Sequence, residues 1–409
     1  MAVEEIVIVG AGVVGASVAY HLTALGHERV TVLDARDRGA LPGSTGLAPG
    51  FVGQLSATEE LAVLAKDSVA TYRELSDPAG RPVFRQVGCL EVATTEERLA
   101  RAHEDVAHGR RLGIGAEVLD GAAVTALAPA LVDGERALGG LHIPSDGAAE
   151  PAAPAEALVA AAERAGARFR WRTPVRALER ERGRVVGVRT GADGDGLLRA
   201  GRVVLATGIW GPVLAAAAGV RLPMVDVHHP YLFTEELPGL DDTPIDAPIV
   251  RYPDHAVYTR RHGRRYGVGS YAHPPLPLEP TAGLRGAEHP FRESDFGSAV
   301  AEAMALVPAF RQAPLGRRLN GVFALTPDEL PPRRPRARRP GPLVRRGELA
   351  HPRRRRRPSP GPSPAGCRPT PGGPGPAGAG PLRPVERPEG PRACAGALPG
   401  HLRRPLSGR

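Results

Sequence analysis

Cysteine is scarce in this sequence, because its 409 residues contain only Cys89, Cys367 and Cys394. Their spacing is not that of metal ligands, and three are too few for a disulfide framework, so we expect no metal site and a reducing compartment. No signal peptide precedes the first predicted strand, and no apolar run is long enough to span a membrane. These absences argue against a secreted disulfide-rich domain and an integral membrane protein, and we expect a cytoplasmic location.

Lysine is almost absent, since Lys66 is the only one beside 52 arginines, and the arginines are unevenly distributed. From Pro331 onward the sequence has 19 Arg, 3 Glu and 20 Pro, but no Lys, Asp, Phe, Trp or Tyr. This stretch carries a charge balance of +16, whereas the preceding 330 residues carry −7. Because its apolar content cannot offset the entropy of ordering, we expect residues 331–409 to form a disordered tail behind a folded part.

The folded part begins with a glycine-rich turn between two apolar strands. The run Ile6–Val9 predicts a buried parallel strand, a helix follows the turn, and a second strand at Val30–Leu33 ends in Asp34. The glycines of the turn are Gly10, Gly12 and Gly15. They permit a tight turn, backbone approach to a pyrophosphate, and close packing of helix and strand, respectively. The helix N-terminus favours phosphate, and Asp34 is placed to accept from a ribose hydroxyl, which together predict a dinucleotide site.

Strand and helix patterns alternate along the folded part and are interrupted by a β-rich segment at 223–273. One long helix is predicted after Thr94 or Thr95, either of which can cap it. The alternation favours an α/β fold in which a doubly wound, Rossmann-like nucleotide-binding domain is interleaved with an antiparallel β-sheet substrate domain. We assign residues 1–80 and 140–222, with part of 318–330, to the first domain, and residues 81–139 and 223–317 to the second.

The fingerprint alone leaves NAD and FAD open, and a second motif favours FAD. Residues 202–212 predict a buried strand that runs into a glycine turn with Ala-Thr-Gly at 206–208, and this resembles the second motif of two-dinucleotide-binding flavoproteins. Further stretches resemble the dimethylglycine and sarcosine oxidase or dehydrogenase family, within the D-amino-acid-oxidase-like flavoproteins. They are GSTGLAPGFVGQ, QVGCLEVATTEERLA, GGLHIPSDG, HHPYLF, YTRRHGRRYGVGSYAH and NGVFALTPD, in the family's order over residues 5–328.

The resemblance implies an enzyme that oxidises an N-methylated glycine, dimethylglycine or sarcosine, at FAD. In the family, a hydride passes from the carbon on nitrogen to flavin N5. The resulting iminium hydrolyses to the demethylated amine and formaldehyde, or passes one carbon to a folate. The implied partner is therefore a small N-methyl amine, whereas the electron acceptor and the oligomeric state stay open.

Three residues of the β-rich segment are candidates for the catalytic chemistry. Hydride transfer requires a neutral amine, so the pocket needs a group that titrates near neutrality, as imidazole does with its usual pKa near 6.5. By resemblance, His229 is the pocket histidine of the family's His-x-Tyr pattern, and Tyr258 is a pocket tyrosine whose hydroxyl contacts substrate. The substrate carboxylate needs a cation, for which Arg260 is the nearest candidate. The structural alternatives are a loop histidine and a core tyrosine.

The resemblance also implies which residues bind the cofactor. The ADP half is expected to lie on Gly10, Gly12, Gly15 and Asp34. The other contacts are expected from Ser44 and Thr45 on the pyrophosphate and flavin side, from the backbone of Val175 at the adenine, and from Thr207, Gly208 and Trp210 beside the flavin. Family members often carry a histidine, bonded to the flavin 8α-methyl, at the position of Leu47. Leucine cannot form this bond, so we predict non-covalent FAD.

The tail departs from the family pattern, in which an aromatic strand and a helix beginning near Thr-His-Ala-Ala-Gly-Val follow the TPD segment. That helix directs its N-terminus at the flavin pyrimidine and stabilises the anionic reduced flavin. GC-rich codons can be chosen for residues 341–358 so that the frame one base later reads ARWFAEASWLTHAAGVA, which looks like the missing segment. We therefore predict a frameshift shortly after Leu330, either real or a sequencing error, which the coding DNA would reveal.

Three alternatives to this interpretation stay open. The basic run at 353–357 could neutralise phosphates on nucleic acid, although a frameshifted GC-rich reading explains the arginines without a nucleic-acid partner. The enzyme could be another secondary-amine or amino-acid oxidase of the same group, which a substrate panel with formaldehyde detection would identify. The chain could also be an inactive, truncated flavoprotein with a basic binding tail, which would purify without yellow flavin.

Overall fold

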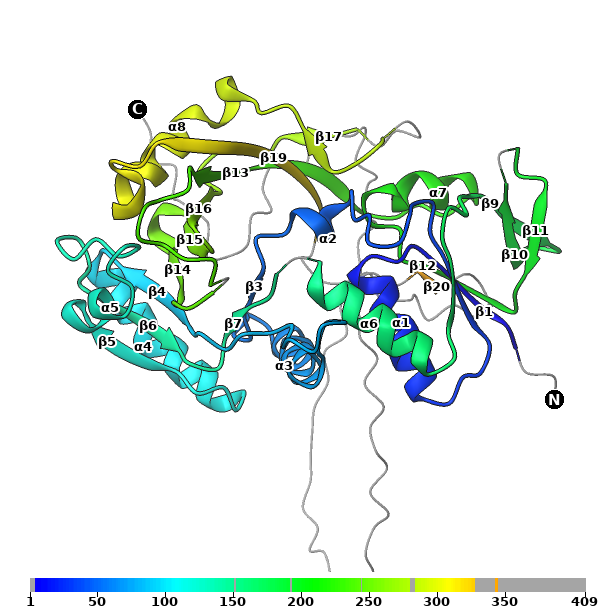
Figure 1. Cartoon of the computed structure of the whole chain (residues 1–409), viewed down its shortest axis with the longest axis horizontal. Coiled ribbons are helices and arrows are strands. Elements are labelled where there is room, and N and C mark those ends of the chain that lie inside the picture. Colours follow the sequence, from blue (N-terminus) through cyan, green and yellow to red (C-terminus); the bar gives the residue numbers. More distant parts are fainter. Residues whose placement is uncertain are drawn as a thin grey trace, which may run out of the picture. The chain divides into compact units, whose positions relative to one another are not determined.

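The computed structural model describes residues 4–150, 152–191, 193–243, 245–279, 284–327 and 343–344, all of which belong to one compact unit. These residues form a five-stranded sheet, a ten-stranded sheet and two small sheets, with helices between and beside them (Figure 1). A parallel sheet of nucleotide-binding type is thus combined with a largely antiparallel sheet, which confirms the predicted α/β fold.

The five-stranded sheet is parallel throughout, in the order β20-β12-β1-β2-β8. Its strands are β1 (Ile6–Val9), β2 (Val30–Leu33), β8 (Arg168–Arg170), β12 (Arg202–Leu205) and β20 (Leu343–Val344). One face of β1 packs with helices α1 (Val13–Ala24) and α6 (Ala153–Arg164) through Ile6 and Ile8. Val7 and Val9 face the other side, so both faces of the sheet are buried. Burial on both faces accounts for the unbroken apolar run that marks β1 in the sequence.

The second face of the parallel sheet is covered by a three-stranded antiparallel sheet and a short helix. The sheet consists of β9 (Val175–Glu181), β10 (Arg184–Thr190) and β11 (Gly196–Arg199). The 3₁₀ turn η1 (Gly208–Trp210) and helix α7 (Gly211–Ala217) follow β12 directly. The side chains of Val188 and Ala215 bring this sheet and α7 into the same apolar cluster as Val7 and Val9.

The ten-stranded sheet follows the order β18-β19-β13-β16-β15-β14-β4-β6-β5, with β17 paired to β13. It is antiparallel except where β14 runs parallel to β4. Its strands are β4 (Cys89–Ala93), β5 (Glu117–Asp120), β6 (Gly139–Ile143), β13 (Val225–Thr234), β14 (Ile249–Tyr252), β15 (Val257–His262), β16 (Arg265–Ser270), β17 (Pro277–Leu278), β18 (Glu288–His289) and β19 (Leu315–Leu325). Our predicted boundary between the two domains, at residues 139/140, falls inside β6. Residues 318–325, which we assign in part to the nucleotide-binding domain, lie in β19. The domain limits stay predictions.

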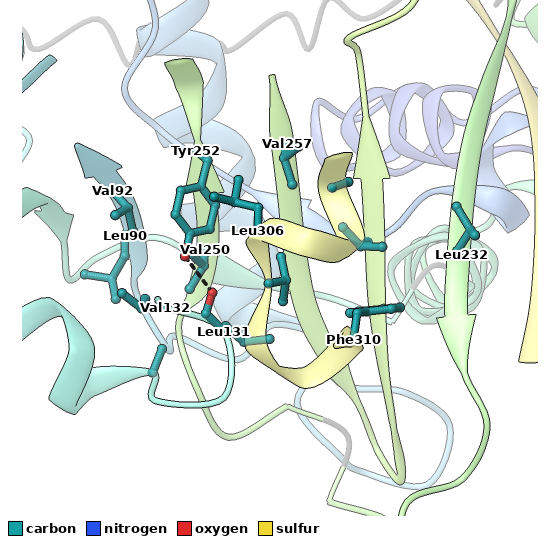
Figure 2. Close-up of a cluster of buried hydrophobic side chains, with 14 of the residues drawn as sticks. Leu90, Val92, Leu131, Val132, Leu232, Val250, Tyr252, Val257, Leu306 and Phe310 are labelled. Carbon is teal, nitrogen blue, oxygen red and sulfur yellow. Dashed lines mark hydrogen bonds between the residues drawn. The ribbon is translucent and has the colours of Figure 1, made fainter. Parts of the chain in front are cut away.

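A large apolar core lies against one face of the ten-stranded sheet (Figure 2). Helix α8 (Glu293–Leu306) and the 3₁₀ turn η3 (Pro308–Phe310) cover strands β14 to β16 there, and helix α5 (Gly121–Leu127) packs on β5 and β6. Tyr252 is the buried polar exception: its hydroxyl donates to the Leu131 carbonyl at 2.9 Å and accepts from the Asp133 amide at 3.1 Å. With both hydrogen bonds made, the tyrosine does not leave a desolvated hydroxyl in the core.

The remaining elements lie outside the two large sheets. They are α2 (Ser44–Leu47), the paired strands β3 (Phe51–Val52) and β7 (Gly147–Ala148), α3 (Glu59–Glu74), α4 (Glu96–Arg111) and the 3₁₀ turn η2 (Pro253–His255). Thr95 caps α4, because its hydroxyl accepts from the Arg98 amide at 3.2 Å, as the sequence predicts. No helix in the described ranges combines the length and apolar character needed to cross a membrane.

The predicted tail lies outside the described residues except at Leu343–Val344. The backbone of these two residues pairs with Val204 and Leu205 as β20, at the edge of the parallel sheet. The free edge of β12 offers hydrogen-bonding groups to such an extended segment. The predicted frameshift and the basic run at 353–357 concern residues that the structure does not describe.

Candidate functional site

The predicted glycine turn lies at the carboxyl end of β1. Gly10 has a φ of +101°, and a Cβ there would lie 2.5 Å from the Ala206 carbonyl oxygen. A Cβ on Gly15 would lie 1.8 Å from the Gly10 oxygen, so α1 packs on the turn only because this side chain is absent. Gly12 is the N-cap of α1 and provides no side-chain cap. The first turn of the helix therefore presents its backbone to the carboxyl edge of the sheet.

Asp34 lies beside this turn at the end of β2. Its Oδ2 accepts from the Ala11 amide at 2.7 Å, and its Oδ1 accepts from the Arg36 amide at 2.9 Å. Asp34, Ala11 and Trp171 also line a small hollow. The carboxylate is thus held next to the glycine turn, and the ribose contact that we predict for it stays a prediction.

The other predicted cofactor residues surround the same edge of the parallel sheet. Thr45 accepts from the Val13 amide at 3.3 Å, and Ser44 donates to the Val322 carbonyl at 2.9 Å. Thr207 follows β12, and its buried hydroxyl has no hydrogen-bond partner among the described residues. Trp210 donates through Nε1 to the Leu284 carbonyl at 2.7 Å. The last two predicted residues are Val175, the first residue of β9, and Gly208, which has a φ of +57°.

A separate cavity of about 200 Å³ lies on the ten-stranded sheet. Strands β13, β15 and β19 supply His229, Tyr258 and Phe323 to its wall, and the segment after β16 supplies Tyr271. His229 stacks on Tyr271 with ring centroids 4.2 Å apart. The structure thus brings two of the three predicted catalytic residues, His229 and Tyr258, into one pocket with aromatic and aliphatic walls.

His229 and Tyr258 are joined by a hydrogen bond of 2.8 Å between the imidazole Nε2 and the phenol oxygen. The other ring nitrogen, Nδ1, is buried and has no partner among the described residues. A cross-strand glycine makes room for the tyrosine, because a Cβ on Gly269 would lie 2.3 Å from Tyr258 Cζ. The ring of Tyr258 therefore lies over the bare backbone of β16 and reaches the histidine.

Burial determines the protonation states in this cavity. It lowers the pKa of His229 to about 3, with a smaller contribution from His273, and it also lowers the pKa of His228 and of His273. Burial raises the pKa of Tyr258 well above its usual value. The expectation that His229 titrates near neutrality is therefore wrong, since desolvation keeps its imidazole neutral at physiological pH.

The third predicted catalytic residue, Arg260, does not line the cavity. Its side chain is 2% exposed, its Nε donates to the Pro49 carbonyl, and its Nη1 lies 3.5 Å from Glu150 Oε1. The loop that follows α2 covers it, and Nη2 is buried without a hydrogen-bond partner among the described residues. The cavity wall contains another arginine, Arg251, which our sequence reasoning missed.

The register of the sheet explains why Arg251 and Tyr271 were missed. Arg251 lies directly opposite Tyr258 in the β14–β15 pair, so the two side chains share a face. Tyr271 follows β16, and its amide donates to the Ala256 carbonyl at 2.8 Å. Strand alternation could have placed Arg251 on one face of β14. Which strand lies beside β14 is not visible in the sequence.

Comparison of the sequence with models of known protein families identifies the family of this chain. Residues 5–347 match the family described as FAD dependent oxidoreductase, DAO. The chain belongs to this family. The match extends beyond Pro331, where we predict the tail to begin, and it includes β20.

Curated relatives of the DAO family match the folded part at modest identity. The chain is similar to 4-methylaminobutanoate oxidase (formaldehyde-forming) of Paenarthrobacter nicotinovorans, with 32% identity over 79% of the chain and 38% of that protein. It is 28% identical to the mitochondrial dimethylglycine dehydrogenase of Rattus norvegicus and 29% identical to the human mitochondrial sarcosine dehydrogenase, in each case over 80% of the chain. The alignments cover 38% and 35% of those two proteins, so the chain spans little more than a third of its relatives' length.

Solved structures share the DAO fold. L-proline dehydrogenase from P. horikoshii superposes with a TM-score of 0.68 at 24% identity, covering 80% of this chain and 83% of that one. Glycine oxidase from Geobacillus kaustophilus gives a TM-score of 0.64 at 24% identity, covering 84% and 88%. At this identity the likeness concerns the fold alone.

The residues at the edge of the parallel sheet fit the cofactor that the family name states. The ADP half of FAD would lie on the N-terminus of α1, where the N-cap Gly12 has no side chain, and beside the carboxylate of Asp34. The flavin half would lie beside Thr207, whose buried hydroxyl has no hydrogen-bond partner among the described residues. Leu47 and Trp210, which we expect on the flavin side, pack on the apolar cluster around Ile209.

Proposed function

We propose that this chain is an FAD-dependent amine oxidoreductase that oxidises an N-methylated glycine, dimethylglycine or sarcosine. The observation that carries the proposal is the cavity, in which a neutral His229 and the hydroxyl of Tyr258 form one hydrogen-bonded unit within aromatic and aliphatic walls. The relatives whose names state dimethylglycine, sarcosine and 4-methylaminobutanoate support an N-methyl amine as the substrate class.

The desolvated cavity itself prepares the amine for oxidation. The surroundings that hold the pKa of His229 at about 3 also disfavour an ammonium ion, so an amine that enters loses its proton more readily than in water. FAD, when bound, supplies the two-electron acceptor for the hydride from the carbon next to nitrogen. His229 and Tyr258 then orient the substrate: Tyr258 fixes the imidazole through Nε2 and leaves Nδ1 for the ligand.

We further propose that FAD is held without a covalent bond, by Gly10, Gly12, Gly15 and Asp34 at its ADP half. Leu47 supports this proposal because an aliphatic side chain stands where the resembling proteins often have a flavin-linked histidine. Its side chain packs with Trp210 around Ile209 and Val322, so the position contributes packing rather than chemistry.

A substrate panel on the FAD-reconstituted protein tests the function. We expect formaldehyde and dye reduction in equal amounts from dimethylglycine or sarcosine, and neither from glycine, D-alanine or L-proline. Dye reduction by proline or D-alanine without formaldehyde would indicate an amino-acid oxidase instead. Protein that stays colourless after reconstitution would indicate an inactive flavoprotein.

Variants of two tyrosines on the ten-stranded sheet test the role of the cavity. Tyr258→Phe removes the hydroxyl that holds His229, and we expect kcat/KM to fall about tenfold. Tyr266→Phe makes the same chemical change outside the cavity, on β16, and is expected to keep wild-type activity. Equal activity of both variants would contradict a role for the Tyr258 hydroxyl.

A further inference from the structure

We propose that Arg251, rather than Arg260, binds the carboxylate of the substrate and thereby restricts the enzyme to amino-acid amines. This inference rests on the proposed function, because it requires a substrate that carries a carboxylate. It concerns one residue of the cavity wall that neither the family match nor the motifs single out.

Strand pairing places Arg251 beside the proposed catalytic pair. Arg251 on β14 lies directly opposite Tyr258 on β15 and opposite Glu91 on the parallel neighbour β4. Directly opposed residues present their side chains on the same face of a sheet. One row across the sheet thus carries a carboxylate, a guanidinium and the phenol that holds His229.

The guanidinium of Arg251 is fixed before any ligand binds. Its Nη1 donates to Glu91 Oε1, and its Cζ lies 5.7 Å from the centroid of the Phe51 ring. The two ion-paired side chains are only 25% and 17% exposed. A planar guanidinium held by an ion pair and an aromatic ring is preorganised for a second carboxylate, so little side-chain entropy is lost on binding.

Electrostatics in the cavity favour Arg251 as the anion-binding group. No Asp or Glu contributes to the described part of the wall, and Glu91 lies outside it. Burial lowers the pKa of the three wall histidines, so at neutral pH they do not supply the positive charge. A desolvated carboxylate needs a charged partner, and Arg251 offers one at the wall. Arg260, by contrast, is enclosed beneath the Pro49 carbonyl.

Binding of an unreactive carboxylate to the FAD-loaded protein tests the proposal. Methoxyacetate has the carboxylate but no amine to oxidise, and methoxyacetamide is its neutral counterpart. Calorimetric titration of the wild type is expected to show preferential binding of methoxyacetate. In Arg251→Met its affinity should fall about tenfold to a hundredfold and approach that of the amide, the size expected for lost hydrogen bonds to a charge. Arg251→Lys should retain part of the preference.

Two further variants keep the test decisive. Arg265→Met removes the same charge from an arginine on β16 that pairs with Glu236 outside the cavity, and should bind methoxyacetate as the wild type does. If Arg251→Met fails to fold because Glu91 is left unpaired, the double variant Glu91→Gln/Arg251→Met is measured in its place. A wild-type preference for methoxyacetate in the folded variant would overturn the proposal.

The kinetic constants separate this inference from the proposed function. With an N-methyl amino acid, loss of Arg251 should raise KM more than it lowers kcat, because the carboxylate is bound equally in ground state and transition state. If Arg251 determines methoxyacetate binding but no N-methyl amino acid releases formaldehyde, the proposed function fails and the anion site stands. Formaldehyde release together with an unchanged preference in Arg251→Met would remove only the assignment of Arg251.

Discussion

Replacing His229 by asparagine is expected to flatten the dependence of the unfolding free energy on pH between pH 7 and pH 5. His229 is buried, and its pKa falls from 6.5 to about 3 in the folded chain. Between these values the unfolded state binds more protons than the folded state. The contribution of this histidine is therefore neutral above pH 6.5 and becomes increasingly destabilising as the pH falls toward 3.

The two pKa values set the size of the effect. At pH 5 the unfolded histidine is almost fully protonated while the folded one is neutral, which costs the folded state about 2 kcal/mol relative to pH 7. Asparagine does not titrate, so this loss should be absent from the variant. Removing the imidazole also leaves the Tyr258 hydroxyl without its partner, at a cost of about 1–3 kcal/mol that is the same at every pH in this range.

Urea unfolding of wild type and variant at pH 7, 6 and 5, with FAD saturating throughout, provides the measurement. The wild type should lose about 2 kcal/mol more than His229→Asn between pH 7 and pH 5. His103→Gln removes an exposed histidine from α4 and should follow the wild type. If His229→Asn and the wild type lose the same free energy, the imidazole is solvated or charged in the folded chain and the reasoning about the cavity fails.

Three further predictions concern the cofactor and the cavity. Gly15→Ala should lose FAD and melt at a lower temperature, because its Cβ would lie 1.8 Å from a backbone oxygen. Gly115→Ala has open space around the new Cβ and should match the wild type in flavin absorbance and Tm. With Leu47 in place, acid precipitation should leave the flavin in the supernatant; flavin fluorescence in the pellet would contradict non-covalent binding. Gly269→Ala should lower kcat/KM at least tenfold, because its Cβ would displace the Tyr258 ring, and unchanged kinetics would show that the ring position is unimportant.

The parts of the fold that could be predicted are those with a local cause. The glycine turn and the strand before it follow from residues 6–15, because the close approach of Gly15 to the Gly10 oxygen is a requirement within one short segment. The cap at Thr95 follows likewise from residues within one turn. The position of β20 could not be predicted, since its pairing with β12 depends on an edge formed by residues far back in the chain.

The residues next to His229 in the sequence do not indicate its pKa in the folded chain. The sequence alone predicts that His229 titrates near neutrality, because imidazole does so in water. Its pKa depends on Tyr271, Tyr258 and Phe323, which reach the ring from three other segments of the chain and exclude water. A sequence gives the usual pKa of a side chain, whereas the shift is a property of the packed surroundings.

The choice between two arginines shows how far strand alternation can be used. Tyr258 and Arg260 are two residues apart on β15, so alternation correctly places them on one face, and Arg260 is the obvious cation for a ligand at Tyr258. Alternation does not predict which other segment of the chain packs over the side chain of Arg260. In the structure the Pro49 carbonyl accepts from Arg260, and the neighbour that stays at the cavity is Arg251, across the strand pair from Tyr258. The proposed substrate site therefore follows the pairing of Arg251 and Tyr258 across the sheet, with Glu91 fixing the guanidinium, rather than a line along one strand.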